Sequence, residues 1–208
     1  MNTTSFVYRN IFIYRFMMDI LYLGKYKKRF TAVIRQIRSL PPDSRILELC
    51  FADIHIAAFC KKEGYHWEGF DINKTFVGLA KSMGFNARCA DLTKLEVFPK
   101  ADVCIMMGSF YHFYPETKLM LRKILNAAEI VVISEPVYNL SNNSGIVGFL
   151  ARRAANAGKG HETFRFNKQS FITMLEENSV PLGYSIAVIQ DVGKDSIVKL
   201  IKNESHRP

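Results

Sequence analysis

The sequence predicts a single α/β domain built on a doubly wound, mostly parallel β-sheet. Between residues 45 and 137, short apolar segments alternate with amphipathic helical segments, which is the pattern of parallel β-α-β units. Near the C terminus two strand-like segments are joined by the turn sequence GKD, which predicts an antiparallel hairpin. The chain has 208 residues, 49% of them hydrophobic, which suits one domain with a substantial core.

The chain is basic, with a formal net charge of +9. This charge favours anionic partners such as nucleic acids, phosphorylated metabolites or an anionic membrane surface. The basic residues are spread over short clusters, however, and form no long basic segment. We therefore expect a solvated basic surface, with a nucleic-acid interface as the less favoured interpretation.

The cysteines predict a protein of a reducing compartment. Cys50, Cys60, Cys89 and Cys104 form no CxxC pair, and each follows or lies within an apolar run. This pattern predicts small buried thiols rather than disulfides or a zinc site, and we expect no metal. The expected location is the cytoplasm.

The first 40 residues predict two helices, the first with apolar residues at Ile13, Phe16, Met17, Ile20 and Leu21. Charged residues interrupt this apolar segment and no cleavage site follows, so it is typical of neither a signal peptide nor a membrane span. An amphipathic segment of this kind could lie on a membrane surface. We expect instead that residues 1–40 pack on their own domain as an N-terminal helical cover.

The central part predicts five strands, each followed or preceded by a helix. The helix after the first strand is expected to end at Gly64, and the next helix to begin at Asn73 as its N-cap and end at Gly84. A further helix is expected to start at or near Pro115. The expected strands are residues 45–51, 66–72, 86–92, 101–110 and 129–137.

The C-terminal part departs from this alternation. Residues 139–166 form a long insertion on the expected ligand side, which predicts a cover over the substrate, within a single domain spanning residues 1–208. Its basic residues could meet a polar or anionic substrate or could simply be solvated; they are Arg152, Arg153, His161 and Arg165. A helix and the hairpin then complete a sheet of seven strands.

Three acids occur at corresponding places along the first three strands. Glu48 lies within the first, Asp71 ends the second and Asp91 ends the third. Ligands of open α/β sheets bind beyond the carboxyl ends of the strands, so these acids could bind an adenosine-like ligand, with Ile72 against the base. The alternative is that Asp71 and Asp91 cap the next helix or turn.

At these residues the chain resembles the class I S-adenosylmethionine-dependent methyltransferases, over residues 45–202. The segment ILELCFADIHIA stands where that family has a strand and a glycine-rich loop, GFDIN resembles its ribose motif and CADL its adenine motif. ADVCIMMGSFYHF resembles its fourth-strand motif. The resemblance implies a Rossmann-like fold, an S-adenosyl-L-methionine cofactor and a small-molecule substrate.

The resemblance also implies roles for individual residues. Glu48 would lie near the methionine amino group, Asp71 would bind the ribose, and Tyr14 would cover the cofactor from the front helix. The cofactor-facing residues implied in this way are Glu48, Cys50, Ala52, Asp71, Ile72, Asp91, Leu92, Gly108, Ser109 and Tyr14.

The loop after the first strand departs from the family pattern, because Cys50, Ala52 and Ile54 occupy its three glycine positions. Cysteine and alanine are expected to be accommodated at negative φ, and Ile54 resists positive φ because it is β-branched. Asp53 is expected to cap the following helix. Its negative charge would lie near the methionine carboxylate unless it turns to the amino group.

The candidate catalytic residues follow the fourth strand. His112 could act as a general base and Tyr111 could shape the methyl-transfer cavity, while the alternative for His112 is a structural histidine. Glu135, at the end of the fifth strand, could bind substrate or cap a loop.

Three functions remain open from the sequence. The first is an S-adenosylmethionine-dependent methyltransferase acting on a small molecule. The second is a methyltransferase-like, non-catalytic binding protein that has lost the cofactor, which the missing glycines suggest. RNA methylation is a third and less favoured function, and an NAD-dependent enzyme explains Asp91 and the hairpin less well.

Overall fold

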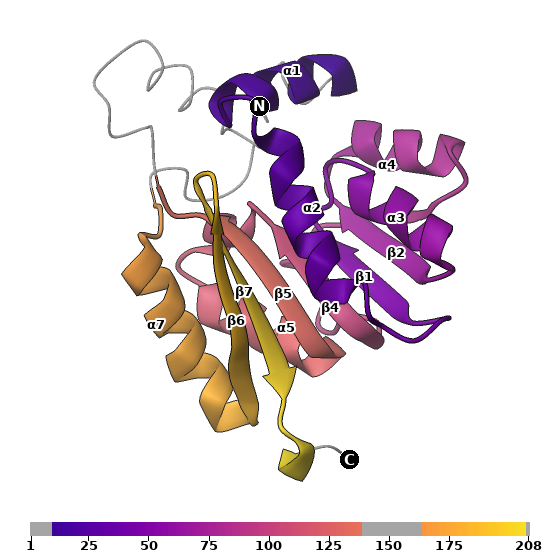
Figure 1. Cartoon of the computed structure of the whole chain (residues 1–208). Helices are drawn as coiled ribbons and strands as arrows, with labels where there is room; N and C mark the ends of the chain where they lie inside the picture. Colours follow the sequence, from indigo (N-terminus) through magenta and orange to yellow (C-terminus); the bar gives the residue numbers. More distant parts are fainter. Residues whose placement is uncertain (1–9, 139–163, 207–208) are drawn as a thin grey trace.

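A computed structural model describes residues 10–138 and 164–206 (Figure 1). Its centre is a sheet of seven strands, as the sequence predicts, and the strand order is β3-β2-β1-β4-β5-β7-β6. The strands are β1 (Arg45–Leu49), β2 (His66–Asp71), β3 (Asn86–Cys89), β4 (Ala101–Met107), β5 (Ala128–Pro136), β6 (Tyr184–Val192) and β7 (Asp195–Lys202). The α-helices are α1 (Ile11–Leu21), α2 (Tyr26–Ile37), α3 (His55–Glu63), α4 (Lys74–Ser82), α5 (Thr117–Ala127) and α7 (Lys168–Ser179).

The first five strands are parallel, and the last two form the predicted antiparallel hairpin. Strand β1 pairs with β2 on one side and with β4 on the other. Strand β7 pairs antiparallel with β5 and with β6. The strand order reverses at β1 and β4, so their carboxyl ends form the crevice in which α/β proteins of this type bind ligands.

Helices cover both faces of the sheet and bury two hydrophobic clusters. Helices α2, α3 and α4 supply the first, which includes Val33, Ile56 and Val77. Helices α5 and α7 supply the second, which includes Leu121 and Phe171. Figure 1 shows α1 lying across the molecule beyond the end of α2. Its residues Tyr14, Met18 and Leu21 are buried in the first cluster, so the N-terminal helices do pack on their own domain.

Local sequence signals account for several helix ends. Helix α3 ends at Gly64, whose φ of 77° is the left-handed conformation that glycine adopts readily. Asn73 caps α4 by accepting a hydrogen bond from the Thr75 amide. Helix α5 begins at Thr117, slightly later than Pro115. Strand β3 is shorter than predicted and ends at Cys89, so Asp91 lies beyond the strand and not within it.

The prediction that all four cysteines are buried is wrong. Cys60 and Cys104 are buried, but Cys50 is half-buried and Cys89 is exposed, and all four are free thiols. Cys89 is exposed because β3 is the edge strand of the sheet, with a neighbour on one side only.

In the part of the chain that the structure describes, no helix is long and apolar enough to span a membrane. Within the same residues, no group of three or more His, Cys, Asp or Glu side chains is placed to hold a metal ion.

Candidate functional site

The loop after β1 has the positive φ values that usually require glycine, although it contains no glycine. Cys50 and Ala52 have φ values of 55° and 47°, so the prediction that they stay at negative φ is wrong. Hydrogen bonds hold this conformation: the Cys50 amide donates to the Phe70 carbonyl at 2.7 Å, and the Ala52 amide donates to Asp71 Oδ2 at 3.0 Å. Tertiary contacts thus offset the strain of a left-handed, non-glycine backbone.

The third position is different, because no positive φ is required there. Ile54 has a φ of −94° and is itself the N-cap residue of α3, with no side-chain capping bond. A β-branched side chain is therefore compatible with this backbone. The prediction that Asp53 caps α3 is wrong. Its carboxylate accepts one hydrogen bond from a backbone amide, that of the adjacent Ile54 at 2.8 Å, and is otherwise turned to a side-chain partner.

That partner is Arg15 of α1. Arg15 Nε and Nη2 donate to the two oxygens of Asp53 at 3.0 and 2.7 Å. The Asp53 side chain is fully buried, and His55 Nε2 lies 3.6 Å from one of its oxygens. The guanidinium neutralises the carboxylate and ties α1 to the loop, so the negative charge predicted beside a cofactor carboxylate is compensated.

Glu48 is buried in the middle of β1 and is held by Trp67 of β2. Trp67 Nε1 donates to Glu48 Oε2 at 2.8 Å, whereas Oε1 is buried without a hydrogen-bond partner. Burial raises the pKa of Glu48 well above its usual value, and the nearby charges of Asp53 and Asp71 raise it further, although the Trp67 bond lowers it. Glu48, Asp53 and Asp71 therefore lie near one another at the carboxyl end of β1. Sequence reasoning identified Glu48 but not Trp67.

Asp71 does perform the capping role left open by the sequence. Besides Ala52, it accepts from the Asn73 amide at 2.7 Å. Burial raises its pKa to about 6, and the backbone hydrogen bonds oppose that rise. The Ile72 side chain beside it is exposed, as a surface for a flat base would be.

Asp91 also forms a local turn, accepting from the Thr93 amide at 3.2 Å and the Thr93 hydroxyl at 2.6 Å. Its neighbour Leu92 is buried in the second hydrophobic cluster, with its side chain in the core. The hydrogen bonds of Asp71 and Asp91 are therefore those of residues that cap a turn. A carboxylate can nevertheless accept further hydrogen bonds.

Gly108, at the end of β4, has a φ of 65° and lies against the buried Arg29 of α2. A Cβ atom at this position would lie 2.6 Å from Arg29 Nη2, so no larger residue fits without displacing the guanidinium. The Gly108 amide donates to the Ser134 carbonyl at 2.6 Å. Glycine here serves both the positive φ and the close approach.

Arg29 is a residue that sequence reasoning missed. It forms an ion pair with Asp195 of β7 at 2.8 Å, and its guanidinium lies 4.8 Å from the centre of the Tyr22 ring. Its Nη2 is buried without a hydrogen-bond partner. One signal was present: Arg29 occupies the apolar face of α2, between Tyr26 and Val33. A lone arginine on such a face indicates a buried charge that needs a partner.

Glu135, at the end of β5, caps a loop. It accepts hydrogen bonds from the Phe110 and Tyr111 amides at 3.1 and 3.4 Å, which holds the short 3₁₀ turn η2 (Phe110–Phe113). Burial and the nearby Asp195 raise the pKa of Glu135 to about 8. Of the two roles predicted for this residue, the structure therefore shows the capping role.

The two candidate catalytic residues lie in this turn. Tyr111 is buried, with the Arg165 guanidinium 3.9 Å from its ring centre and the His112 ring 4.0 Å away. Burial and Arg165 lower the pKa of His112 to about 4, so it is neutral near pH 7. His112 lines a cavity of about 200 Å³, together with residues at the start of α5.

The front helix brings Tyr14 into the core rather than to an open surface. Its ring packs 5.0 Å from that of Phe76 and 6.3 Å from that of Tyr26.

Ser109 follows Gly108 and donates weakly to the Met107 carbonyl at 3.4 Å. Of the predicted insertion, residues 139–163, with Arg152, Arg153 and His161, lie outside the described residues.

The comparisons with known proteins agree with this geometry. The magnesium protoporphyrin IX methyltransferase of Synechocystis, solved with SAH bound, superposes with a TM-score of 0.65 at 15% identity, covering 86% of this chain and 84% of that one. The chain has the class I methyltransferase fold. The [4+2]-cyclase SpnF superposes with a TM-score of 0.62 at 13% identity, covering 86% and 81% of the two chains.

A third structure with the methyltransferase fold acts on RNA by its description. The 16S rRNA methyltransferase RmtF, solved with S-adenosyl-L-homocysteine, gives a TM-score of 0.57 at 16% identity, covering 86% of this chain and 65% of that one. No protein-family model and no curated protein matches the sequence. At these identities the likeness concerns the fold, so the reaction must be argued from the site.

Proposed function

We propose that the protein is an S-adenosylmethionine-dependent methyltransferase that acts on a small molecule. The observation that carries this proposal is the loop after β1. It keeps the positive φ values of a glycine-rich cofactor loop at Cys50 and Ala52, and Asp71 at the end of β2 braces it. A chain with no use for this loop would gain stability from an unstrained backbone at the same place.

Two buried groups without hydrogen-bond partners fit the methionine end of the cofactor. Glu48 Oε1 would accept from its ammonium group, and Arg29 Nη2, beside Gly108, would donate to its carboxylate. Asp71 would bind the ribose and Ile72 would pack on the adenine, with Asp91 and Leu92 at its edge. With an acceptor at one end and a cationic donor at the other, these two side chains would orient the zwitterionic methionine end in one direction.

When bound, the cofactor supplies a methyl group on a sulfonium centre. The protein then has to exclude water and align the acceptor with that group. His112 is neutral near pH 7 and could accept a proton from a hydroxyl acceptor, and Tyr111 would form the wall beside it. With a lowered pKa His112 is a weak base, so orientation is expected to contribute more than proton transfer.

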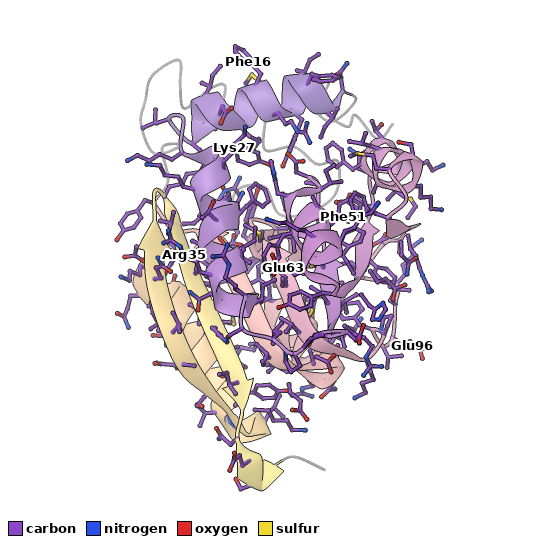
Figure 2. All side chains as sticks on the ribbon, turned by 45° about the vertical axis from the view of Figure 1, so that its right-hand side comes forward. Phe16, Lys27, Arg35, Phe51, Glu63 and Glu96 are labelled. Carbon is purple, nitrogen blue, oxygen red and sulfur yellow. The ribbon has the colours of Figure 1, made fainter. Side chains whose placement is uncertain are left out.

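Isothermal titration with S-adenosylhomocysteine tests the proposal. We expect binding by the unaltered protein and at least a tenfold weaker affinity, about 1.4 kcal/mol, in Glu48→Gln and Asp71→Asn. Glu48→Gln keeps an oxygen for its bond from Trp67, whereas Asp71→Asn keeps only one of the two oxygens that accept from the Ala52 and Asn73 amides. The matched control is Glu96→Gln, because Glu96 is exposed on the loop before β4, at the edge of the view in Figure 2. No heat of binding at millimolar ligand would contradict the proposal.

One observation favours the alternative of a non-catalytic binding protein. Glu48 is only 1% exposed and the Arg29 guanidinium already packs against Gly108, so the cofactor would have to displace or join tightly packed groups. SpnF, by its description a cyclase, also illustrates that this fold hosts other reactions. The same titration separates the alternatives: a folded protein that gives no heat of binding with S-adenosylhomocysteine would favour a binding protein that has lost the cofactor.

RNA methylation is the less favoured substrate class, motivated by the charge of +9 and by the rRNA methyltransferases among the similar structures. Its test is the salt dependence of binding to a structured RNA. If RNA were the substrate, affinity would fall steeply as the salt concentration rises, whereas a flat response would exclude RNA.

We propose a cytoplasmic location, as the cysteine usage predicts.

A further inference from the structure

Helix α1 has two apolar faces, and its own domain covers only one of them. Tyr14, Met18 and Leu21 face the core. On the other side, Phe12, Phe16, Ile20 and Leu23 are 75, 66, 47 and 73% exposed. The four-residue spacing of Phe12, Phe16 and Ile20 places them in one line along α1, and Leu23 follows in the turn after the helix ends at Leu21. Large apolar side chains gathered in this way on a surface usually mark an interaction site.

The outer apolar face, defined as Phe12, Phe16, Ile20 and Leu23, is accessible from outside the molecule. Figure 2 shows Phe16 on the outer side of α1, pointing away from the sheet and the rest of the domain. The acid on this side is Asp19, which is exposed between Phe16 and Ile20. The nearby Arg15 is turned inward and forms an ion pair with Asp53.

The surface next to this face is strongly basic. No acid occurs between Asp19 and Asp43 in the sequence. Of the exposed positions of α2 and its two caps, all but Thr31 carry cations: Lys25, Lys27, Lys28, Arg35 and Arg38. Figure 2 shows Lys27 at the end of α2 nearest α1 and Arg35 further along the helix. Within the described ranges these cations form no ion pair, so their charge is available to a partner.

We propose that the outer apolar face of α1 and the basic face of α2 dock together on an anionic lipid membrane. An interfacial helix buries its apolar residues at the boundary between headgroups and acyl chains and places its cations near the anionic headgroups. Each lysine or arginine near such a surface adds to the electrostatic attraction. An eleven-residue helix is far too short to span a bilayer, so the contact is peripheral.

The combination of residue types favours lipid over the other possible occupants. A nucleic acid would use the cations but would leave Ile20 and Leu23 exposed. A second copy of the chain would use the apolar residues but would bring two sets of cations together, which is unfavourable without counter-charges. Since the α1 anchor Arg15 also pairs with Asp53 in the loop after β1, docking would place the membrane beside the candidate site. The proposal itself does not depend on the reaction at that site.

Co-sedimentation of the full-length protein with vesicles tests the proposal. We expect binding to phosphatidylcholine vesicles that contain about one-third phosphatidylserine, weak binding to phosphatidylcholine alone, and loss of binding at high salt. Phe12→Ser with Phe16→Ser should weaken binding at least tenfold, as should Lys27→Glu with Arg35→Glu. The matched controls are Val97→Ser, an exposed apolar residue elsewhere, and Lys62→Glu on α3, neither of which should change it.

Several outcomes would overturn the proposal. One is no sedimentation with anionic vesicles at low salt while circular dichroism shows a folded protein. Another is sedimentation that the α1 and α2 variants leave unchanged. A dimer in analytical ultracentrifugation that dissociates on Phe12→Ser with Phe16→Ser would assign the face to a second copy. The surface would be assigned to nucleic acid by a third pattern. In that pattern Lys27→Glu with Arg35→Glu weakens RNA binding and vesicle binding equally, and Phe12→Ser with Phe16→Ser weakens neither.

Discussion

Arg15 and Asp53 are 38 residues apart in the chain and form a two-bonded ion pair at 3.0 and 2.7 Å. The pair joins the N-terminal helix to the loop after β1. It resolves the problem that an unpaired aspartate would pose beside a carboxylate ligand, because the guanidinium balances its charge. It also makes α1 part of the site rather than an appendage of the domain.

Arg15→Gln is expected to lower the free energy of unfolding by about 1 to 3 kcal/mol, since it leaves a fully buried carboxylate short of donors. Urea unfolding followed by circular dichroism measures this change. The matched control is Arg45→Gln, because Arg45 and Asp102 form an exposed pair at 3.9 Å. Removal of that pair should cost less than about 1 kcal/mol. Equal effects of the two substitutions would contradict the role assigned to Arg15.

Gly108→Ala is expected to destabilise the protein more than Gly24→Ala does. Both glycines have positive φ values, 65 and 72°, but Gly24 has open space around its Cβ position whereas Gly108 faces Arg29. The conformational strain, about 1 to 2 kcal/mol, is common to both. In a background with Arg29→Leu and Asp195→Asn, the excess cost at Gly108 should largely disappear. Thermal unfolding is measured for the unaltered protein, for Gly108→Ala, for the Arg29→Leu and Asp195→Asn background, and for all three substitutions together. These four proteins give the coupling energy between Gly108 and Arg29.

Glu135→Gln is expected to remove a pH dependence of stability. The pKa of Glu135 is raised from 4.5 to about 8 in the folded protein, so between these pH values the folded state binds a proton that the unfolded state has lost. Stability therefore decreases as the pH rises from about 4.5 to 8, by up to about 5 kcal/mol, and is constant above that range for this group.

The difference in unfolding free energy between the unaltered protein and Glu135→Gln, measured across this range, isolates the effect. His112, whose pKa is lowered to about 4, contributes with the opposite sign between about 4 and 6.5, but it does so in both proteins. Lys194, lowered to about 8, contributes above that pH. A difference that does not vary with pH would show that Glu135 is ionised in the folded protein throughout.

Ala52→Gly is expected to stabilise the protein by up to about 1 kcal/mol, because Ala52 is held at a φ of 47° and glycine adopts this conformation without strain. Ala57→Gly within α3 should have the opposite effect, a loss of about 1 kcal/mol, since glycine is unfavourable in a helix interior. Denaturant midpoints of the two variants check both signs. A loss at both positions would mean that the loop conformation at Ala52 is not strained.

The sequence predicted the layout of the domain because hydrophobic periodicity is a local property. The alternation of strands and helices, the C-terminal hairpin, the Gly64 stop and the Asn73 cap all depend on residues within a few positions of one another. The acids Glu48 and Asp71 could be located for the same reason, as each has a fixed place on its strand. The predicted backbone of the loop was wrong because Cys50 and Ala52 have no intrinsic preference for positive φ.

Only the tertiary structure decided how the charges of the site are paired. Arg15 with Asp53, Trp67 with Glu48 and Arg29 beside Gly108 are contacts between separate elements, and their partners depend on how the helices cross the sheet. The amphipathic pattern of α1 likewise left open whether it packs inward or outward. Helix α1 does both, because it carries apolar residues on two sides and can bury only one of these sides against the domain.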